Sequence, residues 1–97
     1  MKKLAIIGAS TNARVIYKFV EFYKLFEVMC FAVDKEYQNS DSFCGLPLIT
    51  IDDLSKFINK DIDLVFIGVQ WNRLNSDRKH LYNKVKKLGF KFANIIF

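Results

Sequence analysis

A stretch near the start of the chain carries residue types that bind phosphate groups. The apolar run 4–7 ends at Gly8, and the chain continues through Ser10, Thr11 and Asn12. Glycine permits a sharp turn, and Ser, Thr and Asn oxygens cap helices. The free N–H groups and positive dipole end of such a helix favour an anion, most often a nucleotide phosphate. Because Gly8 is this turn's only glycine, a plain, well-capped strand–helix connection stays an alternative interpretation.

A second segment that could bind a ligand follows the apolar run 28–33. Asp34 comes directly after this run, and Lys35 is next. Nucleotide-binding α/β folds use an acidic residue at the end of the second strand to contact a ribose or base. A nearby lysine suits the same class of ligand. The other interpretation of Asp34 is an ordinary carboxylate in a turn at the end of a strand.

A third segment follows the apolar run 64–67. It begins at Gly68 and contains Gln70, Trp71 and Asn72. The Trp71 ring is suited to stacking on a base or sugar, or to a core or interface position. The side-chain amides of Gln70 and Asn72 offer donors and acceptors for a uracil-like edge or sugar hydroxyls.

Residues for catalysis are absent from these segments. Ser10 has no evident base and no G-x-S-x-G surroundings. His80 falls inside a predicted helix and is expected to be a surface residue. Cys30 lies in an apolar run, which predicts a buried thiol, and with Cys44 it has neither zinc spacing nor a C-x-x-C arrangement. We therefore predict a binding module with no catalytic residues, no metal ligands and no cofactor of its own.

The hydrophobic pattern predicts the elements that must position these segments. Continuous apolar runs indicate buried parallel strands, apolar residues at helical spacing indicate helices, and Gly89 is typical of a helix stop. Pro47 argues against a central strand over the full length of its segment. We expect strands at 3–8, 27–33, 63–69 and 90–97, a short extended segment at 45–49, helices at 13–25, 50–59 and 75–88, and an irregular polar excursion at 35–44.

This order predicts an α/β fold: one small, doubly wound, mainly parallel sheet with helices on both faces, formed by a single domain over residues 1–97. In such a sheet the ligand lies beyond the carboxyl ends of the strands, at the switch point. The three segments meet at that edge. Their convergence is stronger support for a nucleotide site than any one of them.

Composition and charge limit the classes of binding partner that we expect. The formal net charge is +5 and the sequence pI is about 9.3, which permits nucleic acid, anionic lipid or phosphorylated small molecules. The lysines are spread along the chain without a nucleic-acid-binding signature, so we expect neither nucleic acid nor a membrane as partner. Without a signal peptide or a transmembrane run, the expected location is cytoplasmic.

With these segments in place, the whole chain resembles the N-terminal domain of bacterial sugar acyltransferases of the bacillosamine-biosynthesis and sialic acid O-acetyltransferase type. The resemblance rests on five pieces in matching order and spacing, of which the second and third are the most specific. They are Ile6-Ile7-Gly8-Ala9-Ser10, Phe31-Ala32-Val33-Asp34-Lys35-Glu36-Tyr37, Phe43-Cys44-Gly45-Leu46-Pro47-Leu48, Ile67-Gly68 with Asn75 and Arg78, and Leu88-Gly89-Phe90-Lys91-Phe92 with Ile95-Ile96.

The resemblance implies a Rossmann-like unit that binds a nucleotide-sugar acceptor, commonly a UDP-amino sugar. It assigns Ser10-Thr11-Asn12 to the phosphates and sugar, and it adds Asp34-Lys35 and Gly68 to the site. The family usually has Gly-Gly-His or Ser-Gly-His in the first turn, where this chain has Ser10-Thr11-Asn12-Ala13. The usual substrate geometry is therefore in question at this turn.

In that family a C-terminal left-handed β-helix forms the trimer, binds acetyl-CoA and supplies a catalytic histidine. The sequence ends at Phe97, about where that domain is expected. The chain is then either an excised domain or a stand-alone protein that has lost catalysis or receives it from a partner β-helix, so enzyme activity stays open. Two other hypotheses are a CoA- or dinucleotide-binding regulatory module and a non-catalytic domain that docks a separate acyltransferase.

Overall fold

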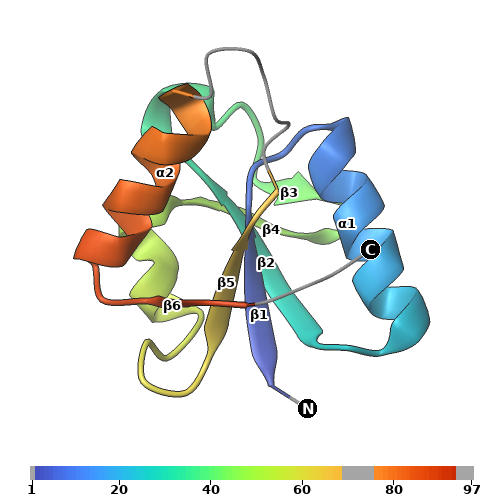
Figure 1. Cartoon of the computed structure of the whole chain (residues 1–97). Helices are drawn as coiled ribbons and strands as arrows, with labels where there is room; N and C mark the ends of the chain where they lie inside the picture. Colours follow the sequence, from blue (N-terminus) through green and yellow to red (C-terminus); the bar gives the residue numbers. More distant parts are fainter. Residues whose placement is uncertain (1, 69–75, 94–97) are drawn as a thin grey trace.

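The computed structural model describes residues 2–68 and 76–93. Over these residues it contains one sheet with helices on both faces, as Figure 1 shows. The strands are β1 (Lys3–Ile7), β2 (Glu27–Val33), β3 (Ser42–Phe43), β4 (Leu46–Thr50), β5 (Leu64–Ile67) and β6 (Lys91–Phe92). The helices are α1 (Thr11–Tyr23) and α2 (Ser76–Lys87), with two 3-10 helices, η1 (Lys35–Tyr37) and η2 (Ile51–Lys56).

The strand order β3-β4-β2-β1-β5-β6 confirms the predicted α/β fold. Every neighbouring pair is parallel except β3 with β4. From β1 the chain passes through α1 to β2, and from β4 it returns through η2 to β5 on the other side of β1. The direction of winding therefore reverses between β1 and β5, which is where such sheets hold a ligand.

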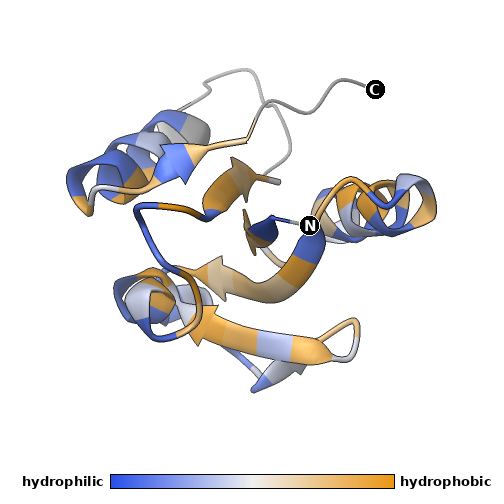
Figure 2. Cartoon of the chain, turned by 90° about the horizontal axis from the view of Figure 1, so that it is seen from below, coloured by the Kyte–Doolittle hydropathy of each residue, from blue (hydrophilic) through white to orange (hydrophobic). Residues whose placement is uncertain are grey.

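Two apolar clusters cover the two faces of the sheet. Ala13, Ile16 and Val20 of α1 pack on one face. Leu81 and Val85 of α2 pack on the other face together with η2. Figure 2 shows the apolar strands enclosed between helices that carry both hydrophobic and hydrophilic residues. Because apolar side chains cover both faces of the sheet, the central strands are continuous apolar runs in the sequence.

Cys30 lies in the second of these clusters and is fully buried. This burial raises the pKa of its thiol to about 12. The thiol is therefore neutral at physiological pH, and its position confirms the predicted buried thiol.

Three predicted elements need correction. The helix expected at 50–59 is the shorter 3-10 helix η2, and its first turn has no side-chain cap from Thr50. The first helix begins at Thr11 rather than at 13, and it ends at Tyr23 because Lys24 adopts a left-handed conformation with φ of 52°. The last strand is β6, which is shorter than the expected 90–97, although residues 94–97 lie outside the described part of the chain.

The excursion predicted to be irregular contains η1 and β3. Phe43 of β3 pairs with Leu46 of β4 across a two-residue turn. Cys44 and Gly45 both have positive φ, 53° and 80°, as a tight hairpin turn requires. Pro47 lies opposite Ser42 in this hairpin, and β4 pairs with β2 only from Leu48 onward. The proline thus stays out of the central part of the sheet, as expected.

Within residues 2–68 and 76–93, neither helix combines the length and the apolar character that a bilayer-spanning segment needs.

Candidate functional site

The first two predicted segments and Gly68 of the third meet at the carboxyl edge of the sheet, at the upper ends of the central strands in Figure 1. The Gly8 N–H donates to the Ala32 carbonyl of β2 at 2.8 Å. The Gly68 N–H donates to the Ile7 carbonyl of β1, also at 2.8 Å. The turn after β1 therefore lies beside the end of β2 on one side and the end of β5 on the other. Gln70, Trp71 and Asn72 lie outside the described residues.

The turn after β1 leads through a backbone position that favours glycine into the N-terminus of α1. Gly8 has φ of 119°, a conformation that other residues adopt only with strain. Ser10 is the extended N-cap of α1, but its hydroxyl makes no capping hydrogen bond, which corrects its expected role as a side-chain cap. Ser10 and Thr11 are both exposed. The Ser10 hydroxyl thus does not occupy the N–H groups of the first turn of α1, where an anion is favoured.

Asn12 has a structural partner within the site. Its side-chain amide donates to the Gly68 carbonyl at 3.2 Å, so it links the first turn of α1 to the end of β5. A Cβ atom at Gly68 would lie 2.9 Å from Cγ2 of Ile6 and 3.3 Å from Cα of Ala13. Gly68 is therefore required for close packing between α1 and the sheet, a role distinct from its predicted ligand contact.

Asp34 is held by a lysine and a histidine of α2. Its Oδ1 accepts from Nζ of Lys84 at 2.8 Å, and its Oδ2 lies 3.2 Å from Nε2 of His80. The Asp34 side chain is only 12% exposed. Residues 80 and 84 are one helical turn apart and face the same direction.

The sequence prediction missed this cluster. His80 is 62% exposed, as its predicted surface position requires, but its contact with Asp34 was not expected. The spacing of His80 and Lys84 was the available signal. It did not identify a carboxylate 50 residues away from Lys84 in the sequence.

The charges around Asp34 raise the pKa of Lys84. The hydrogen bond from Lys84 to Asp34 is the main cause, and the negative charges of Asp34, Asp52 and Glu36 add to it, while partial burial acts in the opposite direction. A lysine whose pKa is raised on folding stabilises the fold below its ordinary pKa. That stabilisation is lost as the pH rises through the raised value.

We therefore expect Lys84→Met to lower the free energy of unfolding by about 1–3 kcal/mol at pH 7, because it removes a charge-assisted hydrogen bond to a largely buried carboxylate. The difference between the two proteins should shrink as the pH rises above ~10.5, where the lysine of the unfolded chain loses its proton, and through the raised pKa of Lys84 in the folded protein. Urea unfolding of both proteins at pH 7 and at pH 11 measures the difference in their free energies of unfolding. A difference that stays the same at both values would contradict this assignment.

Two further side chains complete the edge. Lys35 is exposed in η1, whose position is fixed by a hydrogen bond from the Tyr37 N–H to the Asp34 carbonyl at 2.9 Å. Arg14, which the sequence prediction missed, lies on α1 with its guanidinium 5.5 Å from the centre of the Phe43 ring. It places a second exposed cation one turn beyond Ser10.

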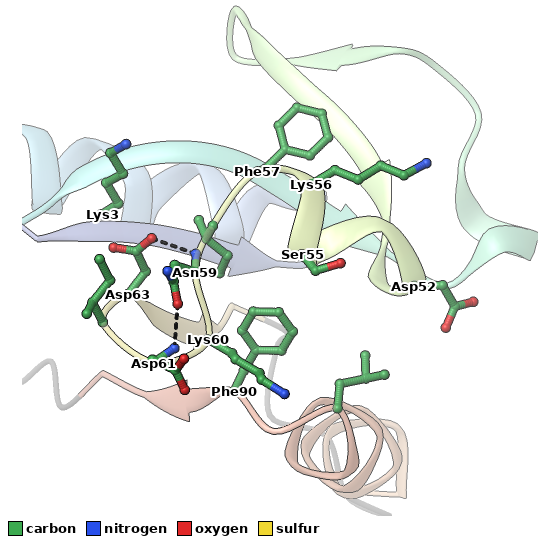
Figure 3. Close-up of a pocket in the computed structure, with 13 residues that line it drawn as sticks. Lys3, Asp52, Ser55, Lys56, Phe57, Asn59, Lys60, Asp61, Asp63 and Phe90 are labelled. Carbon is green, nitrogen blue, oxygen red and sulfur yellow. Dashed lines mark hydrogen bonds between the residues drawn. The ribbon is translucent and has the colours of Figure 1, made fainter.

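A hollow of about 750 Å³ lies away from this edge, between η2, the loop after it and the end of α2 (Figure 3). None of the predicted site residues lines it. In its loop, Asp63 accepts a hydrogen bond from the Asn59 N–H at 2.7 Å, and Asn59 Oδ1 accepts one from the Asp61 N–H at 2.8 Å. Two of its polar side chains therefore hold the loop itself. No group of His, Cys, Asp or Glu suited to a metal ion occurs among residues 2–68 and 76–93.

Comparison with known proteins gives one match. Residues 3–85 match the family model of the PglD N-terminal domain. None of the curated proteins and none of the solved structures matches the chain. The matched residues extend from β1 into α2 and so include all three segments of the edge together with His80 and Lys84.

Proposed function

Because the chain belongs to the PglD N-terminal domain family, the N-terminal domain of a sugar acetyltransferase family, we propose that it binds the nucleotide-sugar acceptor at the carboxyl edge of its sheet. The observation that carries this proposal is the convergence of Gly8–Asn12, Asp34 and Gly68 where the direction of winding reverses. Open α/β sheets bind ligands at this point.

The edge offers complementary chemistry for each part of such a ligand. The N–H groups at the start of α1 suit the diphosphate, as does the exposed guanidinium of Arg14. Asp34 and Lys35 lie where a ribose or base is contacted in related folds. We propose a UDP-amino sugar as the ligand class and place Gln70, Trp71 and Asn72 on its base or sugar.

Acetyl transfer needs groups that we place outside this domain. We propose that a left-handed β-helix, joined in cis or supplied in trans, binds acetyl-CoA and forms the trimer. In this scheme the domain's own residues bind and orient the acceptor, and the catalytic histidine comes from the β-helix. We propose the cytoplasm as the location, because nucleotide sugars and acetyl-CoA are both soluble anionic metabolites.

Isothermal titration calorimetry with UDP-N-acetylglucosamine tests the proposal. We expect saturable binding, and we expect Asp34→Asn to weaken it by about 1–3 kcal/mol, because it removes a charged acceptor at the ribose or base. Asp41→Asn is the matched control, since it removes an exposed carboxylate from the polar excursion that follows Asp34. Its affinity should equal that of the wild type.

The other two hypotheses give different results. Binding of CoA or a dinucleotide without binding of any UDP-sugar would replace the proposal with a regulatory module. Co-purification with a β-helix acyltransferase without nucleotide binding would indicate a docking domain.

A further inference from the structure

We infer that α2 completes the nucleotide-sugar site, because Lys84 and His80 position the Asp34 carboxylate and Lys84 compensates its charge. With this compensation, the edge accepts a diphosphate beside an acidic side chain. The inference rests on the proposed function and deepens it. Nothing in the family match assigns a role to either residue.

The geometry fixes the orientation of Asp34. One carboxylate oxygen is 2.8 Å from Lys84 Nζ, and the other is 3.2 Å from His80 Nε2. Both contacts come from one face of one helix, and the Asp34 side chain is 12% exposed. A carboxylate held at both oxygens keeps one rotamer, and the lone pairs that remain are available to a ligand at the edge.

The same contacts set the local charge. Asp34 comes two residues after Ala32, whose carbonyl accepts a hydrogen bond from the Gly8 N–H. Gly8 belongs to the turn after β1, where we place the diphosphate. An uncompensated carboxylate at this position would repel a diphosphate. Glu36 and Asp52 also lie close enough to raise the pKa of Lys84 by their charge. Lys84 is therefore a cation among three carboxylates, and its removal would leave the phosphates beside an acidic cluster.

The closing experiment compares a charged with an uncharged ligand. UDP and uridine are titrated into the wild type and into Lys84→Met by calorimetry. We expect Lys84→Met to weaken UDP about tenfold and uridine less than about threefold, since only UDP carries the phosphate charge that the lysine compensates. A residue that merely supported the fold would change both affinities by the same factor.

Two further variants serve as a control and as a second test of the contacts to Asp34. Lys87→Met removes a cation from the same helix at an exposed position and should leave the affinity for UDP within twofold of wild type, because exposed charges away from the site are screened. His80→Asn changes a residue that is 62% exposed and leaves Lys84 in place, so it tests the cluster in a folded protein. We expect it to weaken UDP and uridine alike, by less than about threefold, because it loosens the Asp34 carboxylate and leaves the compensating lysine in place.

The outcomes separate the two proposals. If the wild type binds UDP, and Lys84→Met either binds it as tightly as Lys87→Met does or loses UDP and uridine equally, the charge-compensating role of α2 is wrong while the nucleotide site stands. If the wild type binds neither UDP nor UDP-N-acetylglucosamine, both the proposed function and the inferred role of α2 are wrong.

Discussion

Phe31→Ala is expected to lower the free energy of unfolding by about 3–5 kcal/mol, the range for removing a buried phenylalanine side chain. Phe31 is fully buried in the cluster under α1. Its ring makes edge contacts with Tyr17 of α1 at 5.6 Å and with Phe43 of β3 at 4.9 Å between ring centres. The substitution leaves a cavity and removes both aromatic contacts. Since small domains have only about 5–15 kcal/mol of stability, most of it would be lost.

Chemical denaturation of the variant measures this loss. Phe22→Ala is the matched control, because it makes the same change on α1 at a side chain that is 77% exposed. The control should lose less than about 1 kcal/mol. If the two variants were equally stable, the cluster around Phe31 would not be the main support of α1.

The second large effect is expected at Gly68, where Gly68→Val should lower the free energy of unfolding by about 3 kcal/mol, at the upper end of the range for overpacking. Its Cβ would lie only 2.9 Å from Ile6 and 3.3 Å from the backbone of Ala13. The two added methyl groups need further space between β1 and the first turn of α1. We expect α1 to shift and the hydrogen bond from Asn12 to Gly68 to break.

Thermal or urea unfolding gives the stability, and exchange of the hydrogen-bonded amides of α1, from Arg14 onward, reports the shift. Gly45→Ala provides the comparison, because no atom lies within 4 Å of the position of its Cβ and only its φ of 80° opposes a side chain. It should lose about 1–2 kcal/mol from backbone strain and leave α1 protected. Equal exchange in the two variants would contradict the packing role of Gly68.

The central sheet could be predicted from the sequence because its signals are local. After the charged first residues of β1 and β2, Lys3 and Glu27, the three strands β1, β2 and β5 are continuous apolar runs, as is typical of strands with both faces covered. The prediction of three segments at one edge then followed from a general rule of parallel sheets. The short elements were harder. β3 depends on the conformations of Cys44 and Gly45, and η2 satisfies helical spacing for too few residues to distinguish a 3-10 helix from an α-helix.

The sequence by itself therefore determined the fold class, the carboxyl edge and the candidate residues Gly8, Asp34 and Gly68 at that edge. Only the tertiary structure decided what these residues contact. Leu81 and Val85 bury α2 against the sheet, and this packing turns the adjacent His80 and Lys84 toward Asp34. An ion pair between residues 50 positions apart leaves no periodic pattern in the sequence, because helix packing alone brings the two charges together.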